Sequence, residues 1–442
     1  MKKKRPLKKF LSGMEFEFFI VDSNGQIMNK ADLLIKKAKQ NNPNLPITKE
    51  IGNSMIEING YPKEKPEETL QGIMEAYKVL ISVAHREDLF LCPLGCYPGK
   101  FKPKMRTGKV YDIKKKILGE KFPITGTVCG LHYHYTMPKG IFDKKTLKLK
   151  KLVRSELKQS LMSSYNLMIA LDPAITTIMA SSPFYMGKYY GKDSRVFWYR
   201  GGKKLKFMKG LYSEFLSLGG LPPYKQTLTD LSFSLYRRNA IWEKEGIKTG
   251  CNNNFMNKYK SDLDIAWNPV RLNKHDTLEH RGMDINYLDS IMGISTLLNF
   301  TFAKVQKDLL VVVPSDIGKE EPFKIEGNIM YIPPHTHVRN HLQYLAAKDG
   351  FDNEEIRKYC GRFIRLARKL LMKEHINIAK PVFDIYNEKE SLSDKILQFA
   401  SKKGFEKIEE LDEKLAHEIA INAAEESEIR VFETEKLLSK MF

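Results

Sequence analysis

Charged side chains recur at every second position inside segments that are otherwise apolar. Residues 13–18 read Gly-Met-Glu-Phe-Glu-Phe, so two carboxylates alternate with methionine and phenylalanine. Successive side chains of a β-strand point to opposite faces, which places Glu15 and Glu17 on one face and the apolar residues on the other. The pattern predicts a strand over residues 13–21 with one ionic face and one buried face.

Three further segments repeat this arrangement. They carry, in chain order, Glu57 within 54–58, His132 and His134 within 130–135, and Glu279 with Arg281 within 277–281. Carboxylates and imidazoles tolerate a half-buried face only when they are paired or bound to a metal. The four segments therefore predict an antiparallel sheet whose polar face binds metal ions and a polyphosphate.

Much of the remaining chain has a helical pattern. A Pro-Glu-Glu start predicts a helix from Pro66 to about residue 87. Residues 144–169 are also predicted to be helical, and we expect Asp172-Pro173 to end that helix. Residues 181–224 are rich in Gly, Ser, Tyr and Pro, which indicates a long functional loop. Because strands and helices do not alternate in βαβ order, the predicted fold class is α+β, with helices covering the apolar face of the sheet.

The composition is that of a globular protein. Of 442 residues, 42% are hydrophobic and 11% aromatic. No uninterrupted run of apolar residues approaches the length of about 18 residues that a membrane-spanning helix needs. The chain starts with a basic segment, but the short apolar stretch after it contains Glu15 and Glu17, which argues against an export signal. Five cysteines without a CxxC pair argue against a disulfide framework or a zinc site and favour a cytoplasmic location.

The net charge of +20 makes nucleic-acid binding one alternative function. The lysines, however, lie in short scattered clusters, and no helix-turn-helix, zinc-finger or aromatic RNA-binding motif accompanies them. A solvated basic surface that attracts an anionic nucleotide accounts for the charge without a nucleic-acid partner.

Glu15 and Glu17 form the strongest candidate site. Two carboxylates on one face of a largely buried strand repel each other, and a bound cation removes that repulsion. Oxygen ligands favour Mg²⁺ or Mn²⁺, which keep water ligands and bridge phosphates. Glu57 and Glu279 add carboxylates to the same face, and the guanidinium of Arg281 is suited to a bidentate grip on phosphate.

The histidines support a second interpretation. His132 and His134, together with His335 and His337, could supply the ligands of a metal-dependent hydrolase. That chemistry requires the two His-x-His pairs to meet in the fold, and the sequence alone leaves this open. Nucleotide binding by a P-loop or a Rossmann fold is excluded, because neither glycine-rich motif occurs.

Several short motifs carry a family likeness when they are taken in their order along the chain. They are GMEFEFFIVD, SMIEI, CGLHYHY, SSPFYMGKYYGKDSR with GGLPPY, AWNPVR, DTLEHRGMD and the later RNHLQYLAAKDGF. In this order they resemble the glutamate–cysteine ligase type 2 family of carboxylate–amine ligases, over roughly residues 13–350. The resemblance implies a fold like the catalytic domain of glutamine synthetase and the guanidino kinases, in which a curved antiparallel sheet forms a nucleotide cradle.

The resemblance also implies an ATP-dependent ligation. The γ-phosphoryl group of ATP would pass to the γ-carboxylate of glutamate or a related acid, and cysteine or another amine would then displace phosphate from the acyl phosphate. ADP and phosphate would be released. Such phosphoryl transfer depends on positioning and charge neutralisation. The partners implied are small molecules, with neither a membrane nor a nucleic acid among them.

Each candidate residue has a role in this scheme. The ligands of Mg²⁺ or Mn²⁺ would be Glu15, Glu17, Glu57, His132 and Glu279. The catalytic residues would be Arg281, Glu57 and His132, the nucleotide would be bound by Arg281 and Arg271, and the substrate would be bound by Arg195, Ser194 and His134.

The chain departs from the family pattern beside Trp267, where Asn268 replaces the usual Asp. The acceptor amine therefore stays open. We assign residues 1–380 to a ligase catalytic domain. Residues 381–442 are rich in Lys and Glu, and we expect a helical C-terminal extension that packs on this domain or mediates oligomerisation, which leaves a homodimer open.

Overall fold

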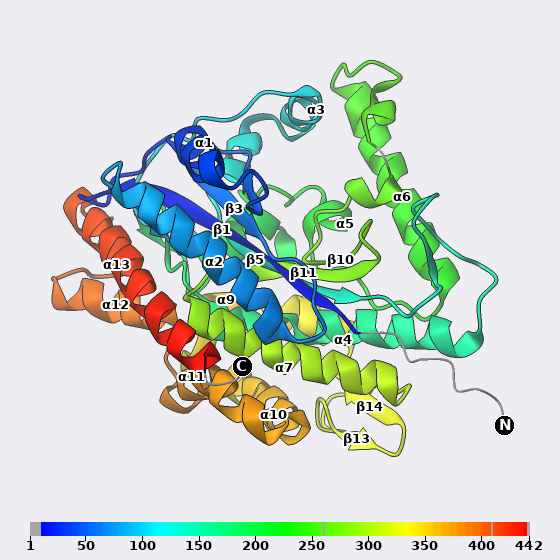
Figure 1. Cartoon of the computed structure of the whole chain (residues 1–442). Helices are drawn as coiled ribbons and strands as arrows, with labels where there is room; N and C mark the ends of the chain where they lie inside the picture. Colours follow the sequence, from blue (N-terminus) through cyan, green and yellow to red (C-terminus); the bar gives the residue numbers. More distant parts are fainter. Residues whose placement is uncertain (1–9, 260, 408–409, 440–442) are drawn as a thin grey trace.

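The alternating segments form the centre of a seven-stranded antiparallel sheet (Figure 1). The computed structural model describes residues 10–259, 261–407 and 410–439, so the basic run at residues 1–9 lies outside the described residues. The path of the sheet is β10 (Val270–Asn273), β11 (Thr277–Asp284), β5 (Gly130–Thr136), β1 (Ser12–Asp22), β3 (Met55–Asn59) and β2 (Ile47–Lys49), with β4 (Leu89–Cys92) paired to the second half of β1.

The register of the strands brings the predicted polar positions side by side. The pairs across neighbouring strands are Glu15 with His132, Glu17 with Glu57, Glu279 with His134, and Arg271 with Glu279. Each pair shares a face because directly opposite residues of antiparallel strands point the same way. The prediction of an antiparallel sheet with one ionic face is confirmed.

Helices cover the apolar face of the sheet in the part of the chain that the structure describes (Figure 1). They are α2 (Pro66–His85), α4 (Ser155–Met179), α7 (Leu288–Lys307) and α13 (Glu413–Leu438). The α2 helix starts as predicted, with proline at its first position and two acidic residues in its first turn. The buried side chains of Met14, Phe16 and Phe18 belong to the core between sheet and helices. Among the described residues, no helix combines the length and hydropathy needed to span a membrane.

The C-terminal helices pack against this layer. The division at residue 380 falls inside α11 (Ile376–Glu388), which contacts α7, as does α10 (Glu354–Leu370). The last helix, α13, lies beside α2 and β4 (Figure 1), and α12 (Leu392–Lys402) contacts α13. These helices contribute to the same core cluster as the sheet. Their part in oligomerisation stays a prediction.

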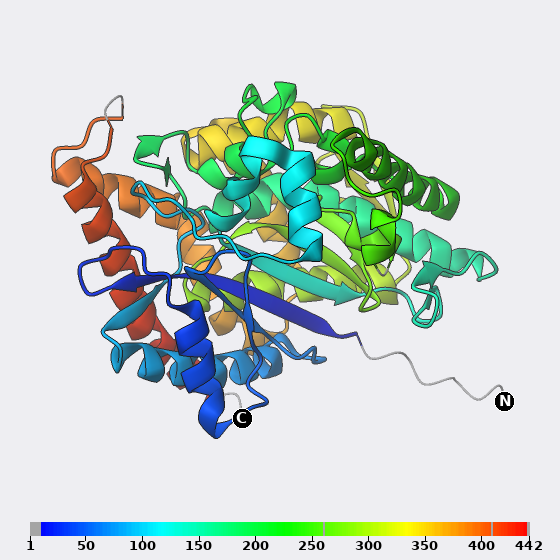
Figure 2. The same ribbon diagram turned by 90° about the horizontal axis from the view of Figure 1, so that it is seen from above.

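Shorter elements lie over the polar face of the sheet, and Figure 2 shows α3 (Lys109–Leu118) in front of the strands. With α5 (Leu216–Gly219) and α6 (Leu228–Lys248), α3 encloses a smaller apolar cluster that includes Trp242 and Trp267. The α6 helix starts at Thr227, whose side chain forms a capping box with Asp230. The polar face is therefore covered by elements that share a separate apolar cluster.

Two expectations about the middle of the chain were wrong. Residues 144–169 are not one helix, because β6 (Phe142–Asp143) and β7 (Lys148–Leu149) form a hairpin and α4 starts only at Ser155. Asp172-Pro173 does not end the helix either, since α4 continues through Pro173 to Met179. An interior proline costs about 3 kcal/mol. Here α4 is almost fully buried from residue 160 onward, and that packing outweighs the local cost.

The expected long loop at residues 181–224 contains short elements instead. They are the β8–β9 hairpin (Phe184–Tyr185 and Lys188–Tyr189), a π-helical turn η2 (Val196–Arg200), a 3₁₀ turn η3 (Lys203–Leu205) and α5. The connections remain irregular. The other α-helices and strands of the described residues are α1 (Ala31–Asn41), α9 (Gln343–Lys348), α8 (His335–His337) and the small sheet of β12 (Val311–Pro314), β14 (Ile329–Ile332) and β13 (Ile325–Glu326).

Candidate active site on the polar face of the sheet

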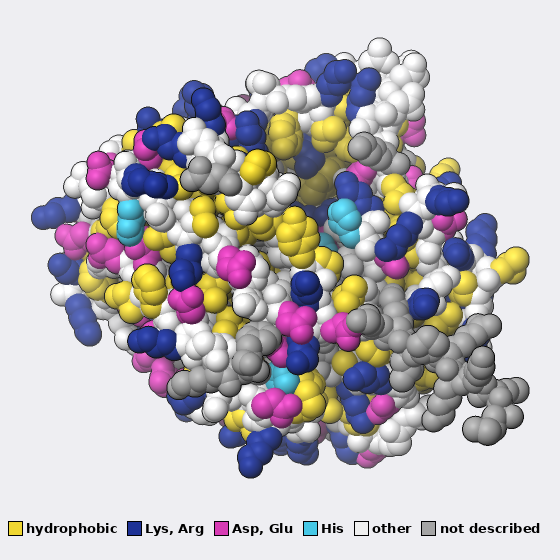
Figure 3. Space-filling view, viewed as in Figure 1, with side chains coloured by type: hydrophobic (Ala, Val, Ile, Leu, Met, Phe, Trp, Pro, Cys, Tyr) yellow, Lys and Arg dark blue, Asp and Glu magenta, His cyan; other side chains and the backbone are white. Residues whose placement is uncertain are grey.

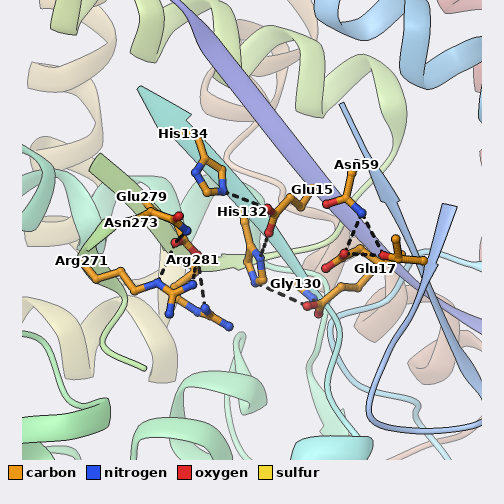
Figure 4. Close-up of polar contacts among 12 residues, drawn as sticks. Glu15, Glu17, Asn59, Gly130, His132, His134, Arg271, Asn273, Glu279 and Arg281 are labelled. Atoms are coloured by element: carbon orange, nitrogen blue, oxygen red, sulfur yellow. Dashed lines mark hydrogen bonds and ion pairs between the residues drawn. The ribbon is translucent and has the colours of Figure 1, made fainter. Parts of the chain in front are cut away.

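Glu15, His132 and Glu17 form the centre of the candidate site (Figure 4). Nδ1 of His132 donates to Oε2 of Glu15 at 2.8 Å, and Nε2 of His132 lies 3.4 Å from Oε1 of Glu17. The other oxygen of Glu17 accepts the backbone N–H of Gly130 at 2.6 Å. Nε2 of His132 points toward Glu17, and that nitrogen is buried without a hydrogen-bond partner.

Further acidic groups surround this centre. Glu57 faces Glu17 across the strands, and its Oε1 accepts hydrogen bonds from Thr48 and Asn59, both at 2.8 Å. Burial, followed by the nearby carboxylates of Glu15 and Glu17, raises the pKa of Glu57. Burial and the carboxylates of Glu57 and Glu17 raise the pKa of Glu50 well above its usual range. This end of the site holds more negative charge than its own partners neutralise.

The opposite end of the site is an arginine–carboxylate cluster. Glu279 is fully buried and accepts from Nε of Arg271 at 2.6 Å, from Asn273 at 2.5 Å and from Nη1 of Arg281 at 3.2 Å. Burial alone would raise the pKa of Glu279, but the charges of Arg271, His134 and Arg281 outweigh this effect and lower the pKa. Glu279 is thus ionised and fixes two guanidinium groups at the edge of the sheet.

His134 links the two ends. Its Nε2 lies 3.3 Å from Oε1 of Glu15, and its Nδ1 lies 3.0 Å from the hydroxyl of Thr277. Burial alone would lower the pKa of His134, but Glu279 and Glu15 outweigh it and raise that pKa. Burial would likewise raise the pKa of Glu15, but its hydrogen bonds with His132 and His134 hold that pKa well below the usual range.

A cavity of about 250 Å³ opens against these residues, and Figure 3 shows the molecular surface hollowed between the α3 and α6 segments. Acidic Glu17 and Glu50 line it together with basic Lys114, Arg195, Arg271 and Arg281 and aromatic Tyr111, Tyr199, Tyr212 and Trp267. Nζ of Lys114 lies 4.5 Å from the centre of the Trp267 ring. Burial, Arg281 and Arg271 lower the pKa of Lys114 to about 7.

The residues present suit a divalent cation. Glu15, His132 and Glu279 offer ligand atoms within 4.8 Å of one another, and so do Glu17, Glu57 and His132. The two groups share His132, whose Nε2 lacks a hydrogen-bond partner. A cation placed there would neutralise the acidic end described above, and its ligands would be mostly carboxylate oxygens, as Mg²⁺ and Mn²⁺ prefer.

Arg195 and Ser194 have different surroundings although they are neighbours in sequence. Arg195 is buried, lines the cavity and donates from Nη2 to the carbonyl oxygen of Arg281 at 3.3 Å. A Cβ at Gly130 would lie 2.3 Å from that Nη2, so a larger residue there would displace the guanidinium. The Ser194 hydroxyl instead donates to the carbonyl oxygen of Pro183 at 2.9 Å, and Ser194 is not among the residues that line the cavity. The structure brings Arg195 to the site and leaves Ser194 outside it.

The two His-x-His pairs do not meet. His335 packs edge-on against the ring of Tyr224, and His337 pairs with Glu355 at 3.0 Å. No group of potential metal ligands among the described residues combines either of them with His132 or His134. The arrangement required for the hydrolase interpretation is therefore absent from this part of the chain.

Sequence reasoning missed Glu50, Asn59, Asn273 and Lys114. Asn273 and Asn59 occupy strand ends two residues from Arg271 and Glu57, so period-2 alternation offered a usable signal for both. Glu50 lies outside the strands, and Lys114 belongs to a lysine-rich helix over the sheet. Neither had a local signal, because tertiary packing brings both to the cavity.

The family model for glutamate–cysteine ligase family 2 matches residues 11–380. The chain belongs to this family. The match includes every candidate site residue described above, and it ends inside α11.

Relatives within the glutamate–cysteine ligase family 2 are distant. A protein of Legionella pneumophila (strain Paris) named "Putative glutamate--cysteine ligase 2-2" is 26% identical over 241 residues, which cover 52% of each chain. A similar protein of strain Corby, named "Putative glutamate--cysteine ligase 2-1", is 28% identical with the same coverage. The chain thus matches about half the length of these curated relatives.

Two solved structures share the fold at low sequence identity. A glutamate–cysteine ligase of Francisella tularensis, in complex with AMP, has a TM-score of 0.59 and 11% identity, covering 98% of this chain and 93% of that one. A bifunctional glutathione synthetase of Pasteurella multocida has a TM-score of 0.54 and 14% identity, covering 95% and 53%. At these identities the likeness concerns the fold alone.

Proposed function

We propose that this protein is an ATP-dependent carboxylate–amine ligase. It phosphorylates the γ-carboxylate of glutamate or a related acid and lets cysteine or another amine displace the phosphate, with release of ADP. The observation that carries the proposal is the convergence of Glu15, Glu17, Glu57, His132 and Glu279, from four strands, beside two arginines and a cavity. Membership in glutamate–cysteine ligase family 2 supports the same reaction class.

The acidic end of the site is suited to hold Mg²⁺ or Mn²⁺ through Glu15, Glu17, Glu57, His132 and Glu279. When bound there, such an ion supplies charge neutralisation for the phosphoryl group in transfer. The role of the chain is to fix the ligands. Glu15 holds the Nδ1 proton of His132, and the N–H of Gly130 fixes one oxygen of Glu17.

The basic end is suited to hold the phosphates of ATP. Arg271 is fixed by Glu279 and by the carbonyl oxygen of Ala266 at 2.9 Å, so its guanidinium is positioned before the nucleotide arrives. Nε of Arg281 is buried without a hydrogen-bond acceptor. A phosphate oxygen would satisfy it and stabilise the charge that develops during transfer. The Lys114 amine, which faces both arginines, gains a favourable partner in the same polyphosphate.

The acid substrate is assigned to the part of the cavity lined by Arg195. Nε of Arg195 is buried and unpaired, so a substrate carboxylate would complete its hydrogen bonding. The Tyr199 ring lies 5.6 Å from this guanidinium and limits its movement. His134 lies 3.3 Å from Glu15 and opposite Glu279 across the strands, and we keep it as a substrate-binding residue.

The proposal is tested by measuring ADP release with Mg²⁺, ATP, glutamate and a panel of amino acids and amines. We expect ADP to appear only when acid and acceptor amine are both present, and the Glu17→Gln variant to be inactive. Glu326→Gln, which changes an exposed glutamate of the small sheet, is the matched control and should retain full activity. The proposal would be contradicted if no acid of the panel gave ADP release, or if Glu17→Gln kept its full activity.

A further inference from the structure

A second group of potential metal ligands lies away from the polar face of the sheet. His337 ends the short helix α8, His341 lies in the π-helical turn η6 (Val338–Leu342), and Glu355 lies in the first turn of α10. The proposed ligase reaction uses none of the three. Of the three, only His337 belonged to the hydrolase interpretation, and the three side chains form a group without His132 or His134.

The three side chains converge on one point. Nε2 of His337 lies 3.0 Å from Oε1 of Glu355, and Nε2 of His341 lies 2.7 Å from Oε2 of the same carboxylate. The centres of the two imidazole rings are 5.0 Å apart, and one ligand atom from each residue falls within 4.8 Å of the others. Ligands of a tetrahedral ion with bonds of about 2.0–2.1 Å lie roughly 3.3 Å apart. Small rotations of the side chains would therefore admit such an ion.

The type of ligand selects the type of metal. Two imidazoles and one carboxylate suit Zn²⁺, Co²⁺ and Ni²⁺, whereas Mg²⁺ favours a shell of oxygens. Burial lowers the pKa of His337, with a further contribution from His341, and this outweighs the opposing effect of Glu355. An imidazole in its neutral form has a lone pair to donate to such an ion.

The surroundings leave room for a fourth ligand. A cavity of about 420 Å³ is lined by His337 and Glu355 together with Asp316, Glu320, Glu321 and Arg362. A water molecule from this cavity could complete a tetrahedral shell. Glu355 is also held in place, because its backbone N–H donates to the Asn353 side chain that caps α10.

We propose that His337, His341 and Glu355 form a binding site for a divalent transition metal of the Zn²⁺ class, separate from the magnesium-type site on the sheet. Such an ion would join the segment that follows β14 to the start of α10. Because the unfolded chain does not hold the three ligands together, metal binding would stabilise the folded state. The site does not depend on the ligase activity.

The test uses the full chain, stripped of metal with a chelator and titrated with Co²⁺ in the presence of excess Mg²⁺. We expect one equivalent of Co²⁺ to give the visible absorption of a four-coordinate ion, and Zn²⁺ to displace it. The His341→Ala variant should lose this equivalent, with the dissociation constant raised at least about 100-fold, because even a residue that only supports a ligand is worth 10- to 100-fold. The His341 side chain is about half exposed, so its removal leaves the fold intact.

His85→Ala is the matched control. His85 forms a comparable surface pair with Glu428 at 2.9 Å, but it belongs to no group of three potential ligands among the described residues. It should bind Co²⁺ as the unmodified protein does. Wild-type affinity and stoichiometry in His341→Ala would overturn the proposal. So would a Co²⁺ signal that Glu15→Gln abolishes and His341→Ala leaves unchanged, because that ion would occupy the sheet.

Discussion

Adjacent residues of β11 belong to two ionic clusters on opposite faces of the sheet. Arg281 lines the cavity and is paired with Glu279 on the same face, and His280 between them faces α4. On the α4 side, the carboxylate of Asp172 accepts two hydrogen bonds from Arg200, at 2.7 and 2.9 Å, and lies 3.0 Å from Nε2 of His280. Both clusters are buried and charged, so burial alone does not distinguish them.

The two clusters differ in how completely their polar atoms are paired. Both oxygens of Asp172 and both ring nitrogens of His280 have partners, and Gln343 adds a further hydrogen bond to Asp172. A Cβ at Gly282 would lie 2.2 Å from Nη2 of Arg200, so the chain closes tightly around this cluster. On the cavity side, Nε2 of His132 and Nε of Arg281 lack partners. Complete pairing indicates a structural role, and unpaired atoms beside a cavity indicate a ligand site.

The largest effect is expected from Glu15→Gln on the cavity side. The amide keeps the shape of the carboxylate but loses the charge that orients His132 and contributes to cation binding. We expect kcat/KM for the proposed ligation to fall by at least about 10³-fold, which is typical for loss of a group that stabilises charge in the transition state. The unfolding midpoint in urea should remain close to that of the unmodified protein. Steady-state kinetics and urea denaturation measure the two quantities.

If Glu15→Gln also unfolded the protein, the two clusters would no longer differ in role. In that case the cavity-side cluster would be structural in the same sense as the Asp172 cluster. A variant with wild-type kcat/KM would contradict the site assignment directly.

The opposite outcome is expected from Asp172→Asn on the α4 side. Removal of the charge leaves the Arg200 guanidinium buried without a counter-ion, which costs about 3–5 kcal/mol of unfolding free energy. Asp384→Asn, which breaks an exposed ion pair with Lys380, is the control and should unfold at the wild-type urea concentration. A stable Asp172→Asn protein would mean that this cluster is not what anchors α4 to β11.

The sequence predicted the strands of the site well, because alternation is a local property. Glu15, Glu17, His132 and Glu279 each lie within a few residues of the apolar positions that fix the face to which they point. The order of the strands follows from no such local signal. The resemblance to a known family implied a curved antiparallel sheet but no order of its strands, and the observed register pairs the polar positions.

The features that the sequence did not predict depend on contacts between segments distant along the chain. Glu50 and Lys114 reach the cavity from a loop and from a helix over the sheet, and neither stands in an alternating pattern. Ser194 was assigned to substrate binding through the family resemblance, and its hydroxyl is bonded to the backbone of Pro183. Pro173 follows the same rule, because tertiary burial keeps it inside a helix that local preference would end.

The smallest effect is expected from Glu57→Gln, and it depends on pH. Because the fold raises the pKa values of Glu57 and Glu50, the folded state binds protons more tightly than the unfolded state. Stability without a divalent cation should therefore fall as the pH rises from the usual glutamate value of 4.5 through these raised values. Removing one carboxylate relieves the repulsion, so Glu57→Gln should gain on the order of 1 kcal/mol at neutral pH without Mg²⁺.

Adding Mg²⁺ shows whether Glu57→Gln is stabilised by relief of carboxylate repulsion or for an unrelated reason. The ion competes with protons for the same carboxylates, so its stabilising effect on the unmodified protein should grow over the pH range in which Glu57 and Glu50 ionise. Glu57→Gln should lose most of that effect, because it lacks a ligand. Asp172→Asn should keep the full shift in melting temperature with Mg²⁺, although it starts from a lower stability. If Mg²⁺ stabilised Glu57→Gln as strongly as the unmodified protein, the excess charge of the polar face would not serve cation binding, and the contrast between the two faces of β11 would lose its functional meaning.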